Sequence, residues 1–138
     1  MSRLTEIVDG LADRLLTIAE FDQNVLTVVR RPATYPAAII VPPAIPDYGI
    51  SIAGQGGQFL VPVLILVGTI DAEMQADLLP FLDWTGSSSV AATIEADRTL
   101  GGLNVDARAV SAEAPGLVEL PDGTPAYGVQ ILVQIIAS

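Results

Sequence analysis

The end of the chain alternates apolar and small or polar side chains at the spacing of a β-strand. The apolar members occupy every second position: Tyr127, Val129, Ile131, Val133 and Ile135. Successive side chains of a strand point to opposite faces, so this pattern predicts a strand with one well-defined core face. Such a strand requires a sheet that is covered on one side.

The start of the chain has helical spacing instead. Apolar residues follow the i, i+3, i+4, i+7 rule: Leu4, Ile7, Val8, Leu11, Leu15 and Ile18. The pattern predicts an amphipathic helix, with Ser2 available as its N-cap. Asp9, Asp13 and Arg14 fall on the other side, where an ordinary solvated face is expected.

Proline and glycine divide the middle of the chain. Residues 25–30 read as a strand ended by Pro32, and residues 35–48 contain four prolines around an apolar patch at 38–41. Because proline lacks the N–H that a ladder needs, an edge strand or an extended arm is expected there. Residues 48–53 and 59–67 are predicted to pair through a glycine-rich hairpin loop at 54–57. The run at 59–67 is far shorter than the roughly 20 residues of a bilayer helix, so no membrane span is expected.

The second half predicts two further helices and two strands. One helix starts at Asp71, carries Phe81 inward and is interrupted by Pro80; the next is capped by Ser87 or Ser88, with Val90 and Ile94 facing inward. Residues 104–113 read as a strand, and residues 121–123 as the turn from it into the last strand. The expected fold class is α+β: a mixed or antiparallel sheet of about four to five strands with an N-terminal helix and two further helices. Residues 1–138 are expected to form a single domain.

The chain contains no histidine, cysteine or lysine. These absences remove the usual zinc ligands, the Ser-His and Cys-His pairs and the Schiff-base amine, so no enzyme, metal or cofactor is expected. The glycine-rich GQGG at residues 54–57 lacks the lysine of a phosphate loop and precedes a strand, which favours a hairpin tip. Asp71, Glu73 and Asp77 are expected to cap and solvate a helix rather than bind a cation. Glu95 and Asp97 do not face each other on a helix, and Arg98 compensates their charge.

Composition indicates a subunit of an assembly. Hydrophobic residues make up 51% of the chain and charged residues 16%, and the net charge is −10. Part of the apolar surplus is expected in subunit interfaces, and the scarcity of cations disfavours binding to phosphates. The adjacent Arg30 and Arg31 are expected to form an inter-subunit salt bridge. Further candidate interface residues are Tyr35, Gln55, Gly56 and Gly57.

One segment resembles a known family. Residues 78–102, LLPFLDWTGSSSVAATIEADRTLGG, resemble the tail terminators of long-tailed bacteriophages, especially those of actinobacterial hosts. Landmarks on either side match the family's layout in order: LTEIVDGLADRLLTI, YPAAIIVPP, FLVPVLILVG and YGVQILVQI. The resemblance covers nearly the whole chain and implies a fold like that of the lambda-type tail terminator.

The resemblance also implies a function in virion assembly. A tail terminator closes into a hexameric ring on the head-proximal end of the tail tube, stops tube polymerisation and forms the head–tail joining interface. The implied partners are further copies of the chain, the tail tube protein and a head–tail connector or stopper protein. DNA passes through the channel without specific binding. The expected location is the tail or neck of the virion, after assembly in the host cytoplasm.

An acidic ring suits the passage of DNA, because strong attraction would hold the genome in place. The second half of the chain contains ten of the sixteen acids. Asp106 and Glu113 lie on or beside a predicted strand, where acids are poorly suited to the core, and are candidate lumen residues.

Other functions remain open at this point. Within virion assembly, the alternatives are another head–tail connector, such as a stopper or head completion protein, or a tail tube subunit. From different classes, the alternatives are a small-ligand binding module that uses the apolar surplus as a pocket, and a hydrolase that uses carboxylates alone.

Overall fold

The computed structural model describes residues 3–21, 24–27, 36–41, 57–68, 79–83, 85–103, 105–112, 116–119, 123 and 125–137. The helical elements are α1 (Arg3–Leu15), the 3-10 helix η1 (Ala19–Phe21) and α4 (Val90–Ala96), and residues 79–82 are helical too. The strands are β1 (Val25–Leu26), β2 (Ala37–Ile40), β3 (Gly57–Gly68), β4 (Val105–Ala112), β5 (Gly116–Glu119) and β6 (Pro125–Ala137).

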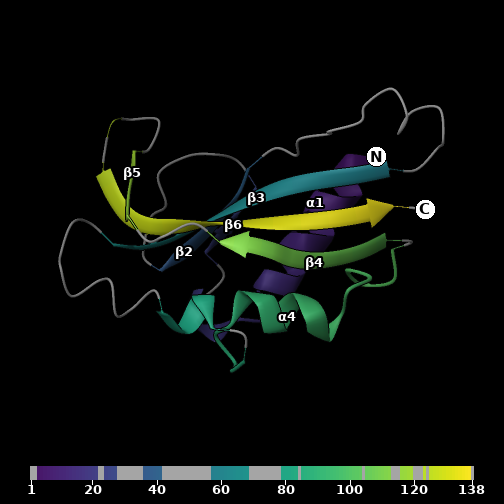
Figure 1. The fold of residues 1–138 in the computed structure, drawn as a ribbon, viewed down its shortest axis with the longest axis horizontal. Helices are drawn as coiled ribbons and strands as arrows, with labels where there is room; N and C mark the ends of the chain where they lie inside the picture. The colour runs from purple at the N-terminus through teal and green to yellow at the C-terminus, as the bar shows by residue number, and fades with distance from the viewer. Residues whose placement is uncertain are drawn as a thin grey trace.

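The strands form one mixed sheet (Figure 1). Its continuous order is β1-β2-β3-β6-β4, and β5 is attached to β6 as a sixth strand. The pair β1 and β2 is parallel, whereas the other described pairs are antiparallel. The predicted α+β class and mixed sheet are therefore confirmed.

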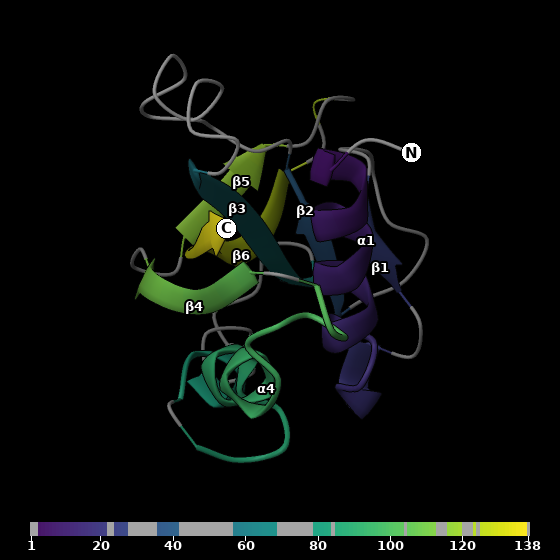
Figure 2. The ribbon, with the colours of Figure 1, turned by 90° about the vertical axis from the view of Figure 1, so that its right-hand side faces the viewer.

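The core lies between one face of this sheet and the helices. The alternation near the chain end is confirmed, because Val133 and Ile135 on β6 are completely buried. The predicted first helix is confirmed too, and its Leu11 and Leu15 are buried in the same cluster. Val90 and Ile94 of α4 join them, so α1 and α4 cover the same face (Figure 2). Among the described helices, none is long and apolar enough to cross a membrane.

The expectation of an edge strand or extended arm within residues 35–48 is wrong for β2. This strand lies between β1 and β3, and all four of its side chains are buried. The four prolines of the region fall outside Ala37–Ile40, so every N–H of β2 is available to a ladder.

A proline does occupy a central strand, at Pro62 of β3. Its carbonyl oxygen accepts a hydrogen bond from the Val41 N–H at 2.9 Å, so the backbone groups of Pro62 face the β2 side. The last residue pair of the β2–β3 ladder is Ile40 with Val63, next to Val41 and Pro62. The missing N–H of Pro62 therefore removes no bond from the ladder with β6.

Three local predictions need correction. The turn at Gly123, where φ is +82°, follows β5 rather than β4, because the short strand β5 was not predicted. Gly57 belongs to β3, opposite Ala137, and not to a hairpin loop. Ser89 caps α4 instead of Ser87 or Ser88, because its extended backbone lets its Oγ accept the Ala92 N–H at 3.0 Å. Other predictions fall on residues outside the described part of the chain, namely Ser2 and residues 28–35, 42–56, 69–78 and 120–122.

Arg14 is not part of an ordinary solvated face, although Asp9 and Asp13 are exposed as expected. Its Nε and Nη2 atoms donate to the Thr93 carbonyl oxygen at 3.2 and 2.8 Å. Thr93 belongs to the last turn of α4, where carbonyl groups lack partners within the helix. Arg14 thus joins α1 to α4 by satisfying a helix-end carbonyl.

Replacing Arg14 by methionine keeps most of the side-chain stem and removes both hydrogen bonds. We expect the free energy of unfolding to fall by about 1.5–2 kcal/mol, the usual scale for bonds from a charged group. Chemical denaturation followed by circular dichroism measures this loss. Arg108→Met is the matched control, because Arg108 is exposed and has no described partner, and its effect should stay within about 0.5 kcal/mol. Equal midpoints for the two variants would contradict the role given to Arg14.

Candidate functional site

The most distinctive surface lies along β4, a terminal strand of the sheet. Helix α4 and the turn that follows it pack beside this strand (Figure 2). The Ala107 N–H donates to the Arg98 carbonyl oxygen at 2.8 Å, which covers the first half of the β4 edge. The side chains of Asp106 and Arg108 are exposed on the strand.

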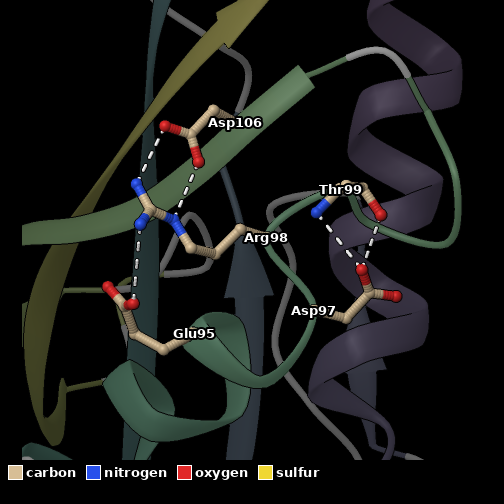
Figure 3. A network of polar contacts seen from close by, with 5 residues as sticks. All are labelled: Glu95, Asp97, Arg98, Thr99 and Asp106. Carbon is tan, nitrogen blue, oxygen red and sulfur yellow. Dashed lines mark hydrogen bonds and ion pairs between the residues drawn. The ribbon is translucent and has the colours of Figure 1, made fainter.

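Arg98 connects the α4 region to β4 (Figure 3). Its Nη2 donates to Asp106 Oδ2 at 2.8 Å, its Nε lies 2.8 Å from Asp106 Oδ1, and its Nη1 lies 3.9 Å from Glu95 Oε2. The side chain of Asp106 is 51% exposed, so this ion pair contributes little to stability, about 0–1 kcal/mol. The ion pair instead changes the local charge, because Arg98 neutralises Asp106, the acid that was predicted to face a channel.

Asp97 organises the turn between α4 and β4. Its Oδ1 accepts hydrogen bonds from the Thr99 hydroxyl at 2.6 Å and the Thr99 N–H at 3.2 Å, and its Oδ2 accepts from the Gly101 N–H at 3.1 Å. The hydrogen bond from the Thr99 side chain is the main reason that the pKa of Asp97 lies below its usual value. Asp97 therefore forms hydrogen bonds within its own turn, and Glu95 lies beside Arg98. The expected compensation by Arg98 is confirmed for Glu95, whereas the described contacts of Asp97 do not include Arg98.

A small apolar groove lies beside the second half of β4. Its volume is about 210 Å³, and it opens to solvent between β4 and the helical residues near α4. The lining residues are Phe81, Leu82, Ala91, Ala109, Val110, Ser111, Ala112 and Ile131. Val110 is 43% exposed there, next to a register shift between Ala109 and Ser111. Main-chain hydrogen bonds of residues 109–112 to elements other than β6 are absent from the described interactions.

The predicted site residues are only partly placed by the structure. Of the candidate interface residues, Gly57 begins β3. The others, Arg30, Arg31, Tyr35, Gln55 and Gly56, lie outside the described residues. Of the two candidate lumen residues, Asp106 is on β4, and Glu113 lies outside the described residues. The structure thus describes two of these candidates, Gly57 and Asp106, and they lie on different strands.

Metal-binding side chains do not cluster in the described part of the chain. It holds no group of three histidine, cysteine, aspartate or glutamate side chains that could bind a metal ion. Of the described carboxylates, Asp97 accepts hydrogen bonds within a turn, and Asp106 and Glu95 are paired with Arg98. Neither the groove nor the Arg98 network was predicted from the sequence, although the compensating charge of Arg98 was.

Comparisons with models of known protein families and with curated protein sequences found no match. The function must therefore be argued from the residues and their arrangement.

Proposed function

We propose that this protein is a structural subunit of a bacteriophage tail, a tail terminator of the lambda type that forms a hexameric ring on the head-proximal end of the tail tube. The observation that supports it most is the order of elements. Three segments that carry the resemblance fold as α1, β3 and β6, and a fourth contains α4. Their succession along the chain is the layout expected of that family.

Charge and chemistry support the same proposal. The net charge is −10, and lysine, histidine and cysteine are absent. A ring of such subunits repels the DNA that must pass through it, which lets the genome slide. In the proposed particle the ring contacts the tail tube protein on one side and a connector or stopper protein on the other, in the neck of the virion.

The groove beside β4 favours a partner protein over a small ligand. Its volume of about 210 Å³ lies below the roughly 300–1,000 Å³ that is typical of small-molecule sites. One of its walls is a strand edge, and strand edges pair with other chains. Its dimensions suit one or two apolar side chains of another protein.

Tail length tests the proposed function. Purified tail tube protein is polymerised with and without this protein, and tube lengths are measured by negative-stain electron microscopy. We expect short tubes that carry the protein at one end only, because a terminator stops growth where it binds. Phage particles that lack the protein should have overlong tails.

The same images separate the alternatives within virion assembly. A tail tube subunit would be found along the tubes, and a stopper or head completion protein would bind the connector without changing tube length. Unaltered tube length together with bare tube ends would refute the terminator function.

A further inference from the structure

The sheet ends in two different strands, β4 on one side and β1 on the other (Figure 2). Their relative direction follows from the pairings. β4 is antiparallel to β6, β6 to β3, and β3 to β2, whereas β2 is parallel to β1. β4 therefore runs opposite to β1. If a second copy continued the sheet with its helices on the same face, its β1 would meet β4 as an antiparallel strand, the arrangement with the better hydrogen-bond geometry.

The two edges also match in chemistry. Among the described residues, residues 109–112 of β4 make main-chain bonds to β6 alone, so no described strand pairs with their outer side and a strand can be added there. On β1, Val25 is half-buried and packs against the helix-covered core, whereas Leu26 packs on the opposite face of the sheet. In a continued sheet, Val25 is therefore the β1 side chain of the second copy that lies on the same face as the apolar groove.

Charge favours a second copy as the occupant. Arg108 is exposed on β4 and has no ion-pair partner among the described residues. The chain has sixteen acids and six arginines, so another copy brings an excess of carboxylates to this cation.

We propose that the outer edge of β4 at residues 109–112, together with the groove beside it, binds the β1 edge of a second copy of this chain. The inference rests on the proposed ring, for which it names the subunit interface. Each copy uses two different surfaces in this contact, so the interface is head-to-tail, and repeated contacts close a ring if the rotation permits.

Cysteine cross-linking tests the contact, because the natural chain contains no cysteine. Val110→Cys and Thr27→Cys change exposed positions at the β4 edge and just after β1. These positions lie at opposite edges of one sheet, so a disulfide between them joins two copies. After mild oxidation of the purified double variant with copper phenanthroline, we expect a ladder of disulfide-linked species larger than a dimer.

Matched variants give the controls. Each single variant has one thiol and should give no species beyond a dimer. In the pair Val110→Cys with Ala96→Cys, both thiols lie on the β4 side of the sheet, so a head-to-tail contact should give no ladder. Efficient dimers of Val110→Cys alone would indicate two-fold pairing of β4 with β4 and would overturn the proposal. A monomeric, uncross-linked double variant at high concentration would overturn it as well.

Tube capping separates this inference from the proposed function. Val110→Asp is expected to stay folded, because Val110 is 43% exposed, and to lose both oligomers and capping. Leu16→Asp, which changes a similarly exposed side chain on the helix end, should retain both. Capping by Val110→Asp would refute the interface but not the function, whereas a cross-linked ladder of a protein that never shortens tubes would refute the function but not the interface.

Discussion

Replacing Gly128 by valine is expected to destabilise the fold strongly. Gly128 lies on β6, opposite Leu66 of β3 on one side and Gly116 of β5 on the other. A Cβ atom at this position would overlap the Ile65 carbonyl oxygen and would lie 2.7 Å from Leu66 Cδ2. Because the first of these atoms is backbone in the neighbouring strand, relief requires that β3 and β6 separate. We expect a loss of about 3 kcal/mol or more in the free energy of unfolding.

The cross-strand neighbour provides the control for this substitution. A Cβ atom on Gly116 would meet nothing within 4 Å, and its backbone is not in the left-handed region. Gly116→Ala should therefore be neutral or stabilise the strand by up to about 1 kcal/mol, since alanine restricts the unfolded chain more than glycine does. Urea denaturation of both variants measures the difference. A cooperative transition of Gly128→Val at the midpoint of the natural protein would show that β3 and β6 are not packed this closely.

Reversing two acids should make the proposed ring retain DNA. The variant combines Asp106→Arg with Glu113→Arg, and the ring repeats each change once per subunit. Where the added arginines face the channel, each new contact with a DNA phosphate changes the binding constant for DNA. The slope of its logarithm against the logarithm of the salt concentration becomes more negative by about 0.9 per contact. We therefore expect DNA retention that is strong at low salt and lost at high salt, with little retention by the natural protein.

The ion pairs of Arg98 with Asp106 and Glu95 affect the outcome of this experiment. Asp106 is paired with Arg98, so its replacement by arginine both adds a cation and releases another one. The fold should survive, because an exposed pair of this kind contributes only about 0–1 kcal/mol. Asp9→Arg with Asp13→Arg makes the same change in net charge on the exposed side of α1. Equal retention by the two double variants would show that Asp106 and Glu113 have no special relation to the channel.

The elements that the sequence predicted well are those with long, regular patterns. Both α1 and β6 were predicted because many apolar residues recur with a single period, and both bury that face as expected. Short elements carry too few residues for a period. β5 has four residues, and its place in the sheet depends on pairing with β6 rather than on its own pattern. The position of β2 in the sheet was wrongly predicted because the prolines lie on either side of Ala37–Ile40 and none lies within it.

The candidate site was less predictable, because it depends on contacts between distant segments. Arg14 and Thr93 are 79 residues apart, and no local pattern indicates their hydrogen bonds. The groove brings together four separate parts of the chain, near residues 81, 91, 110 and 131. The pairing of Arg98 with Glu95 follows helical spacing and was foreseeable, whereas its contact with Asp106 required the position of β4.

The position of β6 has a consequence for synthesis on the ribosome. Of the described strands, β6 is translated last, yet β3, β4 and β5 all pair with it. Until it emerges, the apolar β3 lacks its longest partner and exposes a hydrophobic strand edge to other nascent chains. Non-local pairing of this kind slows folding and favours aggregation during the delay. The sheet is therefore completed only after this region has been translated, and the yield of soluble protein should depend on chaperones.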